Sequence, residues 1–373
     1  MILRNLLLFC ILVLYGCENT YARECNSCMN FRECPELLEM IQRMNIIELS
    51  PMIQRAKCEI GYKNGQRIPK ICCEDFIQIG SRNGINETKV EETVNIETHK
   101  NIALLPEICG RIDGDRIIGG EIPGLYELPW MALILVRDNG IFKTQCGGTI
   151  INNKYILTAA HCVRRRRTAV VVRVGEYDIN SKVDCQGEHP FRMCETHIQD
   201  IRVDKYIIHE NFTSSPTAND IALIRLKKPI DFSFKNVEPI CLPIYDKLRN
   251  MDISTKNAVV SGWGITEFKS MSNFLRKVEI PIKTDFECKQ HYSSEISDSD
   301  TDMKFICAGD ESKDSCNGDS GGPLTMEEEY KDNYRIIQFG IVSKGSKQCG
   351  LNVPGLYTDV RKYIKWILDK IEE

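Results

Sequence analysis

The distribution of cysteines constrains the fold of this 373-residue chain more than any other feature, because its eighteen cysteines fall into separate groups. Cys10 and Cys17 form the first group, within residues 1–22. There Arg4 precedes an apolar run and Thr20-Tyr21-Ala22 has the form of a cleavage site, so these residues predict a secretory signal peptide. The apolar run is shorter than the ~20 residues of a membrane-spanning helix, so we expect a secreted, extracellular protein without a transmembrane segment.

Without these two, sixteen of the eighteen cysteines enter an oxidising compartment, where pairing is the default. Six lie within residues 23–73, a segment too short to build a large hydrophobic core without covalent help. The other ten lie further along the chain, so two disulfide-bonded modules are predicted. A zinc site at Cys25-x-x-Cys28 is the less favoured alternative, because the adjacent Cys72-Cys73 pair suits tetrahedral ligation poorly.

Between the two modules, residues 74–106 are polar with little periodicity and predict a flexible linker. Asn86-Glu87-Thr88 in this stretch is an acceptor for N-glycosylation, and Asn211-Phe212-Thr213 is a second one. The net charge of -4 is small for this length. Charge therefore indicates neither nucleic acid nor a membrane surface as a partner.

Short β-rich runs recur beyond residue 117, for example Ala169-Val-Val-Val-Arg-Val and Ile221-Ala-Leu-Ile-Arg-Leu. Gly, Asn and Asp separate them, which predicts an antiparallel barrel or sandwich. Only residues 360–371 have helical spacing of apolar side chains. The C-terminus is therefore expected to be a helix.

Four short motifs follow one another beyond the linker. They are Arg116-Ile-Ile-Gly-Gly, Thr158-Ala-Ala-His161-Cys162, Asn219-Asp220-Ile-Ala-Leu and Asp314-Ser-Cys-Asn-Gly-Asp-Ser320-Gly-Gly-Pro. In this order they resemble the chymotrypsin family over residues 117–373. The resemblance implies a mainly β fold of two antiparallel six-stranded β-barrels with a C-terminal helix. It also implies a trypsin-like serine-type endopeptidase that requires no cofactor for catalysis.

The residue types in these motifs are those that amide hydrolysis needs. A hydroxyl nucleophile is inert at its own pKa, so it requires a neighbouring base that a third group orients. The resemblance implies that Ser320 is the nucleophile, His161 the base and Asp220 the orienting carboxylate. It further implies that the backbone N–H groups of Gly318 and Ser320 form the oxyanion hole.

The pocket for the substrate side chain is implied by the same resemblance. Asp314 would lie at its base and pair with Arg or Lys, while Ser343, Gly345 and Gly355 would line its walls. Lys344 departs from the family pattern, in which an aromatic residue is usual. The preference for residues further along the substrate therefore stays open.

Activation by proteolysis is also implied. An upstream protease would cut after Arg116, and the new α-amino group of Ile117 would pair with Asp319 and form the oxyanion loop. The chain would thus be a zymogen.

The N-terminal module resembles the clip domain of arthropod haemolymph proteases. The domains would then be a clip domain at 23–73, a linker and activation segment at 74–116, and a protease domain at 117–373. Cysteine spacing alone leaves 15 pairings open for six cysteines. The clip resemblance implies Cys25–Cys72, Cys28–Cys58 and Cys34–Cys73. The protease resemblance implies Cys109–Cys241, Cys146–Cys162, Cys288–Cys307 and Cys316–Cys349, which leaves Cys185 and Cys194 to close their own loop.

Clip proteases act in extracellular zymogen cascades, so the resemblance implies an upstream activating protease and downstream protein zymogens cut at a basic residue. Serpin-type inhibitors are further expected partners. Innate immunity, through Toll or prophenoloxidase activation, is the leading role. A developmental, venom or digestive protease stays open, as does a non-catalytic clip homologue that acts as a binding cofactor.

One acidic loop resembles the calcium site of some clip proteases. Its expected ligands are Glu176, Asp178, the carbonyl of Ser181 and Asp184. Hard oxygen ligands from one loop suit Ca²⁺. A solvated acidic loop without an ion is the alternative.

Overall fold

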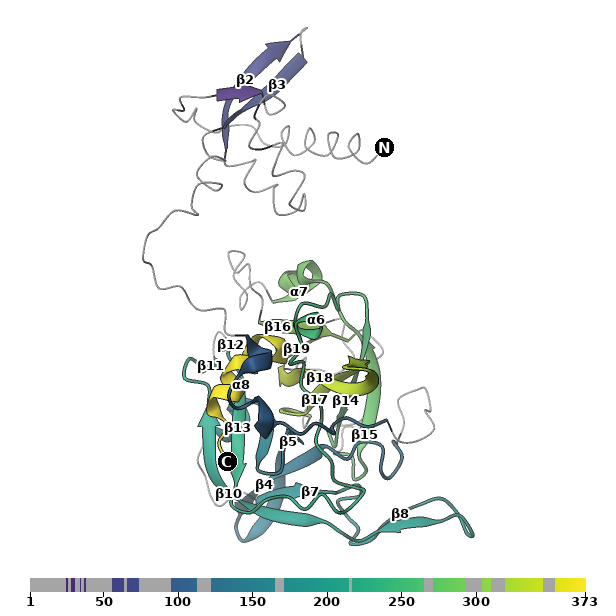
Figure 1. Ribbon diagram of the computed structural model, residues 1–373. Helices are drawn as coiled ribbons and strands as arrows, with labels where there is room; N and C mark the ends of the chain where they lie inside the picture. The colour runs from purple at the N-terminus through teal and green to yellow at the C-terminus, as the bar shows by residue number, and fades with distance from the viewer. Residues whose placement is uncertain are drawn as a thin grey trace. The chain divides into compact units, whose positions relative to one another are not determined.

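The computed structural model describes residues 25, 28–30, 34, 37, 56–63, 66–73, 95–112, 122–164, 171–214, 217–264, 271–292, 304–309, 319–344 and 353–373. The chain divides into two compact units, Met1–Glu92 and Thr93–Glu373 (Figure 1). None of the helices in these described ranges is long and apolar enough to cross a bilayer. The predicted signal peptide and residues 74–94 of the predicted linker lie outside the described residues.

The first unit contains a three-stranded antiparallel sheet in the order β1-β3-β2. Its strands are β1 (Cys28–Asn30), β2 (Lys57–Lys63) and β3 (Gln66–Cys72). Three disulfides hold it: Cys25–Cys72, Cys28–Cys58 and Cys34–Cys73. These are the pairings that the clip resemblance implied. Four of the six cysteines are buried, so the covalent bonds form much of the small interior.

A closed six-stranded barrel forms the first half of the second unit, in the order β10-β13-β6-β5-β4-β7. Its strands are β4 (Met131–Asp138), β5 (Ile141–Ile150), β6 (Tyr155–Thr158), β7 (Val171–Val174), β10 (Gln199–Ile208) and β13 (Ala222–Leu226). Neighbouring strands β6 and β13 bury all but one of their side chains. Their sequences are accordingly continuous apolar runs.

A six-stranded antiparallel sheet forms the second half, in the order β15-β14-β17-β18-β19-β16. Its strands are β14 (Asn257–Gly262), β15 (Arg276–Pro281), β16 (Phe305–Ala308), β17 (Pro323–Tyr330), β18 (Asn333–Lys344) and β19 (Gly355–Asp359). A bridge between Ile282 and Ala308 brings the two edges of this sheet together. The expected mainly β fold with two six-stranded halves is confirmed.

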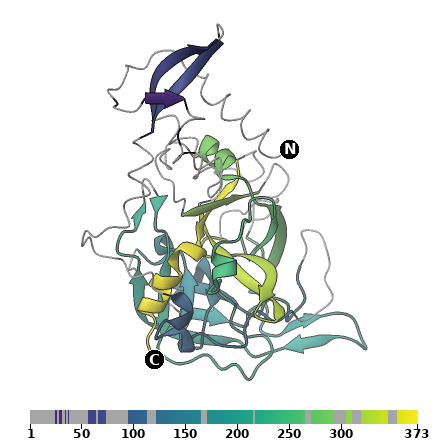
Figure 2. The same ribbon diagram turned by 45° about the horizontal axis from the view of Figure 1, so that its top comes forward.

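Short elements connect and cover the two halves. They are the hairpins β8 (Asp184–Gln186) with β9 (Met193–Glu195) and β11 (Thr213–Ser214) with β12 (Thr217–Ala218), and the helices α5 (Ala160–Val163), α6 (Asp246–Arg249), α7 (Asp285–His291), η4 (Val360–Tyr363) and α8 (Ile364–Lys370). The β8–β9 hairpin, drawn in teal, projects from the side of the unit in both views (Figures 1 and 2). The predicted C-terminal helix begins with a 3₁₀ turn, so its α-helical part starts at Ile364.

Residues 95–112, which we call the N-terminal belt, begin the second unit and are ordered against the rest of it. The belt forms the 3₁₀ turns η2 (Ile96–Thr98) and η3 (Ile102–Leu104), which lie beside α8 (Figure 1). The Asn101 amide donates to the carbonyls of Leu368 and Ile371, at 2.8 and 3.1 Å, at the C-terminal end of α8. The prediction of a flexible linker up to residue 106 is therefore wrong for 95–106. Those polar side chains cap carbonyls of another element, which no local pattern records.

The described residues of the second unit contain four disulfides: Cys109–Cys241, Cys146–Cys162, Cys185–Cys194 and Cys288–Cys307. The structure thus contains seven of the eight expected pairs. Cys316 and Cys349 lie outside the described residues. Cys109 anchors the belt to the chain between the two halves.

Candidate active site

His161 and Asp220 meet because their strands are neighbours. Strand β6 ends at Thr158, just before α5 carries His161, and β13 pairs antiparallel with β6 directly after Asp220. The Asp220 carboxylate accepts from His161 Nδ1 at 2.7 Å and from the His161 backbone N–H at 2.9 Å. A donating Nδ1–H leaves Nε2 of a neutral imidazole as the acceptor, which is the state a general base requires.

Asp220 is 1% exposed and is also held from the second half of the unit. Ser343 Oγ, on β18, donates to the Asp220 carboxylate at 2.6 Å. Thr358 Oγ1, on β19, donates to the Asp220 carbonyl at 2.9 Å. The site therefore lies where the barrel meets the second sheet. Ser343 was predicted only as a pocket wall, whereas here it also contacts the orienting carboxylate.

Asn219 shapes the backbone in front of Asp220. It has a φ of 50°, in the left-handed region that asparagine tolerates better than most residues. Its side-chain amide donates to the Asn211 carbonyl at 3.0 Å and accepts from the Tyr363 hydroxyl at 3.0 Å. Sequence reasoning missed these contacts and that of Thr358. The Asn-Asp pair was the one local signal, because its first residue suits a positive φ.

Ser320 lies in a tight turn that packs against both halves. Its carbonyl accepts from Gly147 N at 2.8 Å, and the next residue, Gly321, has a φ of 79°. A Cβ on Gly321 would lie 3.2 Å from Sγ of Cys162 and would overlap the backbone of Gly147. The turn therefore lies against α5, which carries His161. The structure contains no hydrogen bond between Ser320 and His161, and such catalytic contacts often tighten only with substrate bound.

Asp319 has its carboxylate in a cradle made by two glycines. Gly264 N donates to Asp319 Oδ1 at 2.8 Å. A Cβ on Gly262 or on Gly264 would overlap the same carboxylate. Only glycine at both positions leaves room for it.

The other predicted pocket and activation residues are only partly described. Gly355 is buried at the start of β19, and Lys344 ends β18, where it pairs with Leu356. The remaining residues lie outside the described residues; they are Arg116, Ile117, Asp314, Gly318, Gly345 and the glycosylation acceptor Asn86. The second acceptor, Asn211, is exposed.

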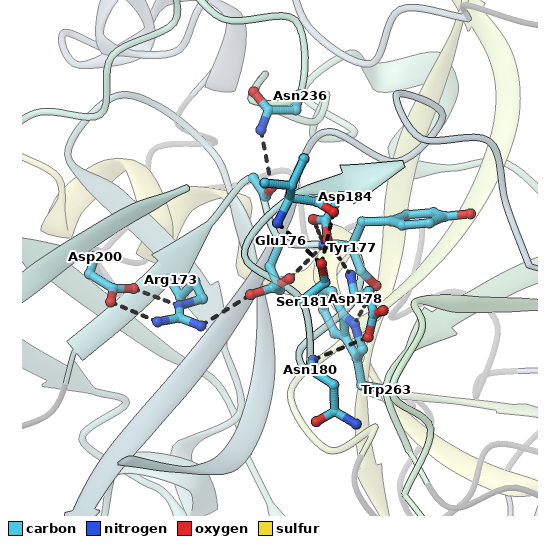
Figure 3. Close-up of polar contacts among 12 residues, drawn as sticks. Arg173, Glu176, Tyr177, Asp178, Asn180, Ser181, Asp184, Asp200, Asn236 and Trp263 are labelled. Atoms are coloured by element: carbon cyan, nitrogen blue, oxygen red, sulfur yellow. Dashed lines mark hydrogen bonds and ion pairs between the residues drawn. The ribbon is translucent and has the colours of Figure 1, made fainter. Parts of the chain in front are cut away.

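The acidic loop, residues 176–184, contains two enclosed carboxylates (Figure 3). The side chain of Glu176 is fully buried and receives Arg173 at 3.1 Å, while Asp184 accepts from the backbone N–H groups of Tyr177 and Asp178 at 3.1 and 3.3 Å. Burial raises the pKa of Glu176, and the nearby Asp184 charge raises it further. Burial likewise raises the pKa of Asp184.

The predicted calcium ligands of the acidic loop do not converge on one point. Asp178 accepts from Asn180 N at 3.1 Å, and the Ser181 hydroxyl donates to the Val183 carbonyl at 2.8 Å. The described residues hold one tight group of potential metal donors, Cys146, His161 and Cys162, and its two cysteines form a disulfide. That group is therefore part of the catalytic framework and does not offer free thiolates.

Comparison with known proteins settles the family. The trypsin family profile matches residues 117–367. The chain belongs to the trypsin family. It is a clip-domain serine protease and a serine endopeptidase, since a CLIP domain-containing serine protease matches it at 35% identity over 98% of the chain.

Three relatives illustrate the extent of the match. Melanization protease 1 of Drosophila melanogaster is 35% identical over 96% of this chain and 97% of its own length. CLIP domain-containing serine protease HP8 of Bombyx mori is 35% identical over 98% of this chain and 97% of its own. The crystal structure of the Drosophila Grass clip serine protease of the Toll pathway has a TM-score of 0.63 and 30% identity, covering 94% of this chain and 97% of that one.

Proposed function

We propose that this clip-domain protease is a secreted zymogen that an upstream protease cuts after Arg116. The active enzyme then cleaves downstream protein zymogens after Arg or Lys in an extracellular cascade of innate immunity. The observation that carries the catalytic part is the buried Asp220, which is bonded to His161 and Ser343 beside the Ser320 turn. The cascade part is supported by a relative named Melanization protease 1 and by the solved Grass protease of the Toll pathway.

Two further parts of the proposal concern partners and modification. Serpin-type inhibitors would end the activity, because the catalytic hydroxyl of such an enzyme must be switched off in a circulating fluid. N-glycosylation is proposed at Asn86 and Asn211, and the exposure of Asn211 supports the second site. A developmental, venom or digestive role would use the same chemistry on other substrates.

A structural Ca²⁺ at the acidic loop is also proposed. The loop offers the hard oxygen donors that Ca²⁺ prefers, and burial raises the pKa of both enclosed carboxylates. Arg173 pairs with Glu176, and a bound ion would have to draw the separated donors together. Glu176, Asp178, Asp184 and the Ser181 carbonyl would hold the ion. Bound there, Ca²⁺ would supply positive charge that tightens the loop, with no part in bond cleavage.

The test uses the full-length zymogen and a variant with Arg116→Gln. A trypsin-like protease should produce a new N-terminus at Ile117 and release amidolytic activity on an Arg substrate, and it should do neither in the variant. Ser320→Ala should be cut equally and stay inactive. Activity of the Arg116→Gln variant after the same treatment would contradict the proposed switch.

Specificity is tested in the activated enzyme with Asp314→Ser. Loss of the pocket carboxylate leaves a buried guanidinium without its counter-charge, a cost of about 3 to 5 kcal/mol for pairs of this kind. Cleavage of Arg and Lys substrates should therefore fall by two or more orders of magnitude, while the zymogen melts normally. Unchanged cleavage after Arg would remove Asp314 from the pocket.

A further inference from the structure

The geometry points to Tyr177 as a positioning residue that joins the acidic loop to both partners of the activation contact. We infer that it holds in place both the segment that follows the Arg116 cut and the end of β14, whose next residues bind the Asp319 carboxylate. The inference rests on the proposed function, because it concerns the ion pair expected between Ile117 and Asp319. Tyr177 is 4% exposed and lies at the centre of Figure 3.

The backbone of Tyr177 is bonded on both sides. Its N–H donates to Glu176 Oε1 at 3.0 Å and to Asp184 Oδ2 at 3.1 Å, so it is tied to both enclosed carboxylates. Its carbonyl accepts from Leu275 N at 2.8 Å and from Trp263 Nε1 at 3.3 Å. The residue is thus fixed between the loop and the second sheet.

The Tyr177 hydroxyl reaches the segment that follows the Arg116 cut. It donates to the Pro123 carbonyl at 2.9 Å, within buried surroundings. The next residues are held as well, since Leu125 N donates to Gln186 Oε1 at 2.8 Å and Glu127 pairs with Lys277. An extended chain spans at most about 3.6 Å per residue, so an anchor at Pro123 restricts the new N-terminus at Ile117 to a radius of roughly 20 Å.

The Tyr177 carbonyl is connected to Asp319, the other partner of the activation contact. Trp263, whose indole N–H donates to Tyr177, is followed by Gly264, whose N–H donates to Asp319 Oδ1 at 2.8 Å. Trp263 is 1% exposed and lies beside the acidic loop in Figure 3. The side chain of Tyr177 therefore contacts the segment that continues from Ile117, and its carbonyl contacts the strand end that holds the Asp319 carboxylate.

Loss of the Tyr177 hydroxyl alone should weaken the contact between Ile117 and Asp319 without altering the pocket for the substrate side chain. In Tyr177→Phe the Pro123 carbonyl loses a buried donor, so the segment that delivers Ile117 is less restrained. We expect the fraction of activated molecules with a buried N-terminus to fall by about two- to tenfold, the range of one hydrogen bond. The value of kcat should fall by a similar factor, with KM unchanged.

The experiment compares wild type, Tyr177→Phe and Tyr206→Phe after cleavage at Arg116. Tyr206 is a matched control, because it is half-buried on β10 and its hydroxyl has no hydrogen-bond partner in the described parts of the chain. Cyanate carbamylates an exposed, unprotonated α-amino group, so mass spectrometry of the Ile117 peptide measures burial of the N-terminus directly. The variant should be modified about two- to tenfold faster than wild type, and the control at the wild-type rate.

The outcomes separate this inference from the proposed function. If cleaved wild type has no amidolytic activity, the proposed function fails. If wild type is active and Tyr177→Phe matches it in carbamylation rate and in kcat, the positioning role of Tyr177 is refuted. Melting of the uncleaved zymogens checks folding. Trp263→Phe, which removes the indole donor together with part of the buried ring, should move both readouts in the same direction as Tyr177→Phe.

Discussion

Gly264→Ala should disable the activated enzyme while leaving the fold intact. The added Cβ would lie closer than 3.0 Å to three atoms of the Asp319 carboxyl group, which is more than van der Waals overlap permits. Gly264 does not have the left-handed backbone that alanine resists. The substitution therefore acts through its side chain alone, on the carboxylate that the proposed activation contact needs.

The size of the effect follows from the contact that is lost. To admit the methyl group, the Asp319 carboxylate must move away from Gly264 N, which now donates to it at 2.8 Å. A hydrogen bond to a charged group contributes about 1.5 to 3 kcal/mol. Because every 1.4 kcal/mol is a factor of ten, the active fraction should fall by roughly 10- to 150-fold.

The assay combines active-site titration with kcat and KM after cleavage at Arg116. Gly124→Ala is the matched control, since its Cβ would make ordinary contacts, the nearest at 3.7 Å from Glu127. We expect fewer titratable sites in Gly264→Ala, an unchanged KM in the sites that remain, and wild-type behaviour in the control. Wild-type activity of Gly264→Ala would refute the assignment of the glycine cradle to activation.

Two further predictions concern the belt and the acidic loop. In Cys109→Ser/Cys241→Ser, cleavage after Arg116 should leave the N-terminal fragment bound to the protease without a covalent bond. The contacts that remain are the Asn101 cap on α8, the Arg111–Glu238 pair and the backbone hydrogen bonds of Gly110 with Pro239 and Ile336. Gel filtration tests this, and release of the fragment at micromolar concentration would contradict it. The pKa values of Glu176 and Asp184 are raised, so the folded protein favours the neutral forms of these two carboxyl groups. Their contribution to the free energy of unfolding is complete at a pH below the pKa of an unfolded carboxyl group. It is lost as the pH rises through their raised pKa values in the folded protein. Without Ca²⁺, the melting temperature should therefore fall from pH 4 to 7 more steeply than in Glu176→Gln/Asp184→Asn. At pH 7, Ca²⁺ at 100 times a dissociation constant of about 10⁻⁴ M should raise the free energy of unfolding by about 2.7 kcal/mol. This corresponds to an increase of roughly 5 to 10 °C in the melting temperature, and it should occur in wild type only.

The sequence by itself was sufficient for the family, the order of the catalytic motifs and the mainly β fold. These follow from local information: His161 beside Cys162, Asp220 before an apolar strand, and Ser320 within Gly-Asp-Ser-Gly-Gly each occupy a short motif. Six cysteine pairs also agree with those that the resemblance implied, and Cys185–Cys194 agrees with the pair that was left over. A disulfide framework is well specified once the module is known, because each bond fixes two positions that may be far apart in the chain.

The tertiary structure alone decided which distant residues support those motifs. Thr358 and Ser343 reach Asp220 because β19 and β18 lie against the barrel. Tyr177 contacts Pro123 and Trp263 for the same reason, since sheet pairing brings together segments whose separation along the chain carries no periodic signal. The belt is the clearest case: its polar residues suggest a linker, and only the exposed carbonyls at the end of α8 make them an ordered part of the protease unit.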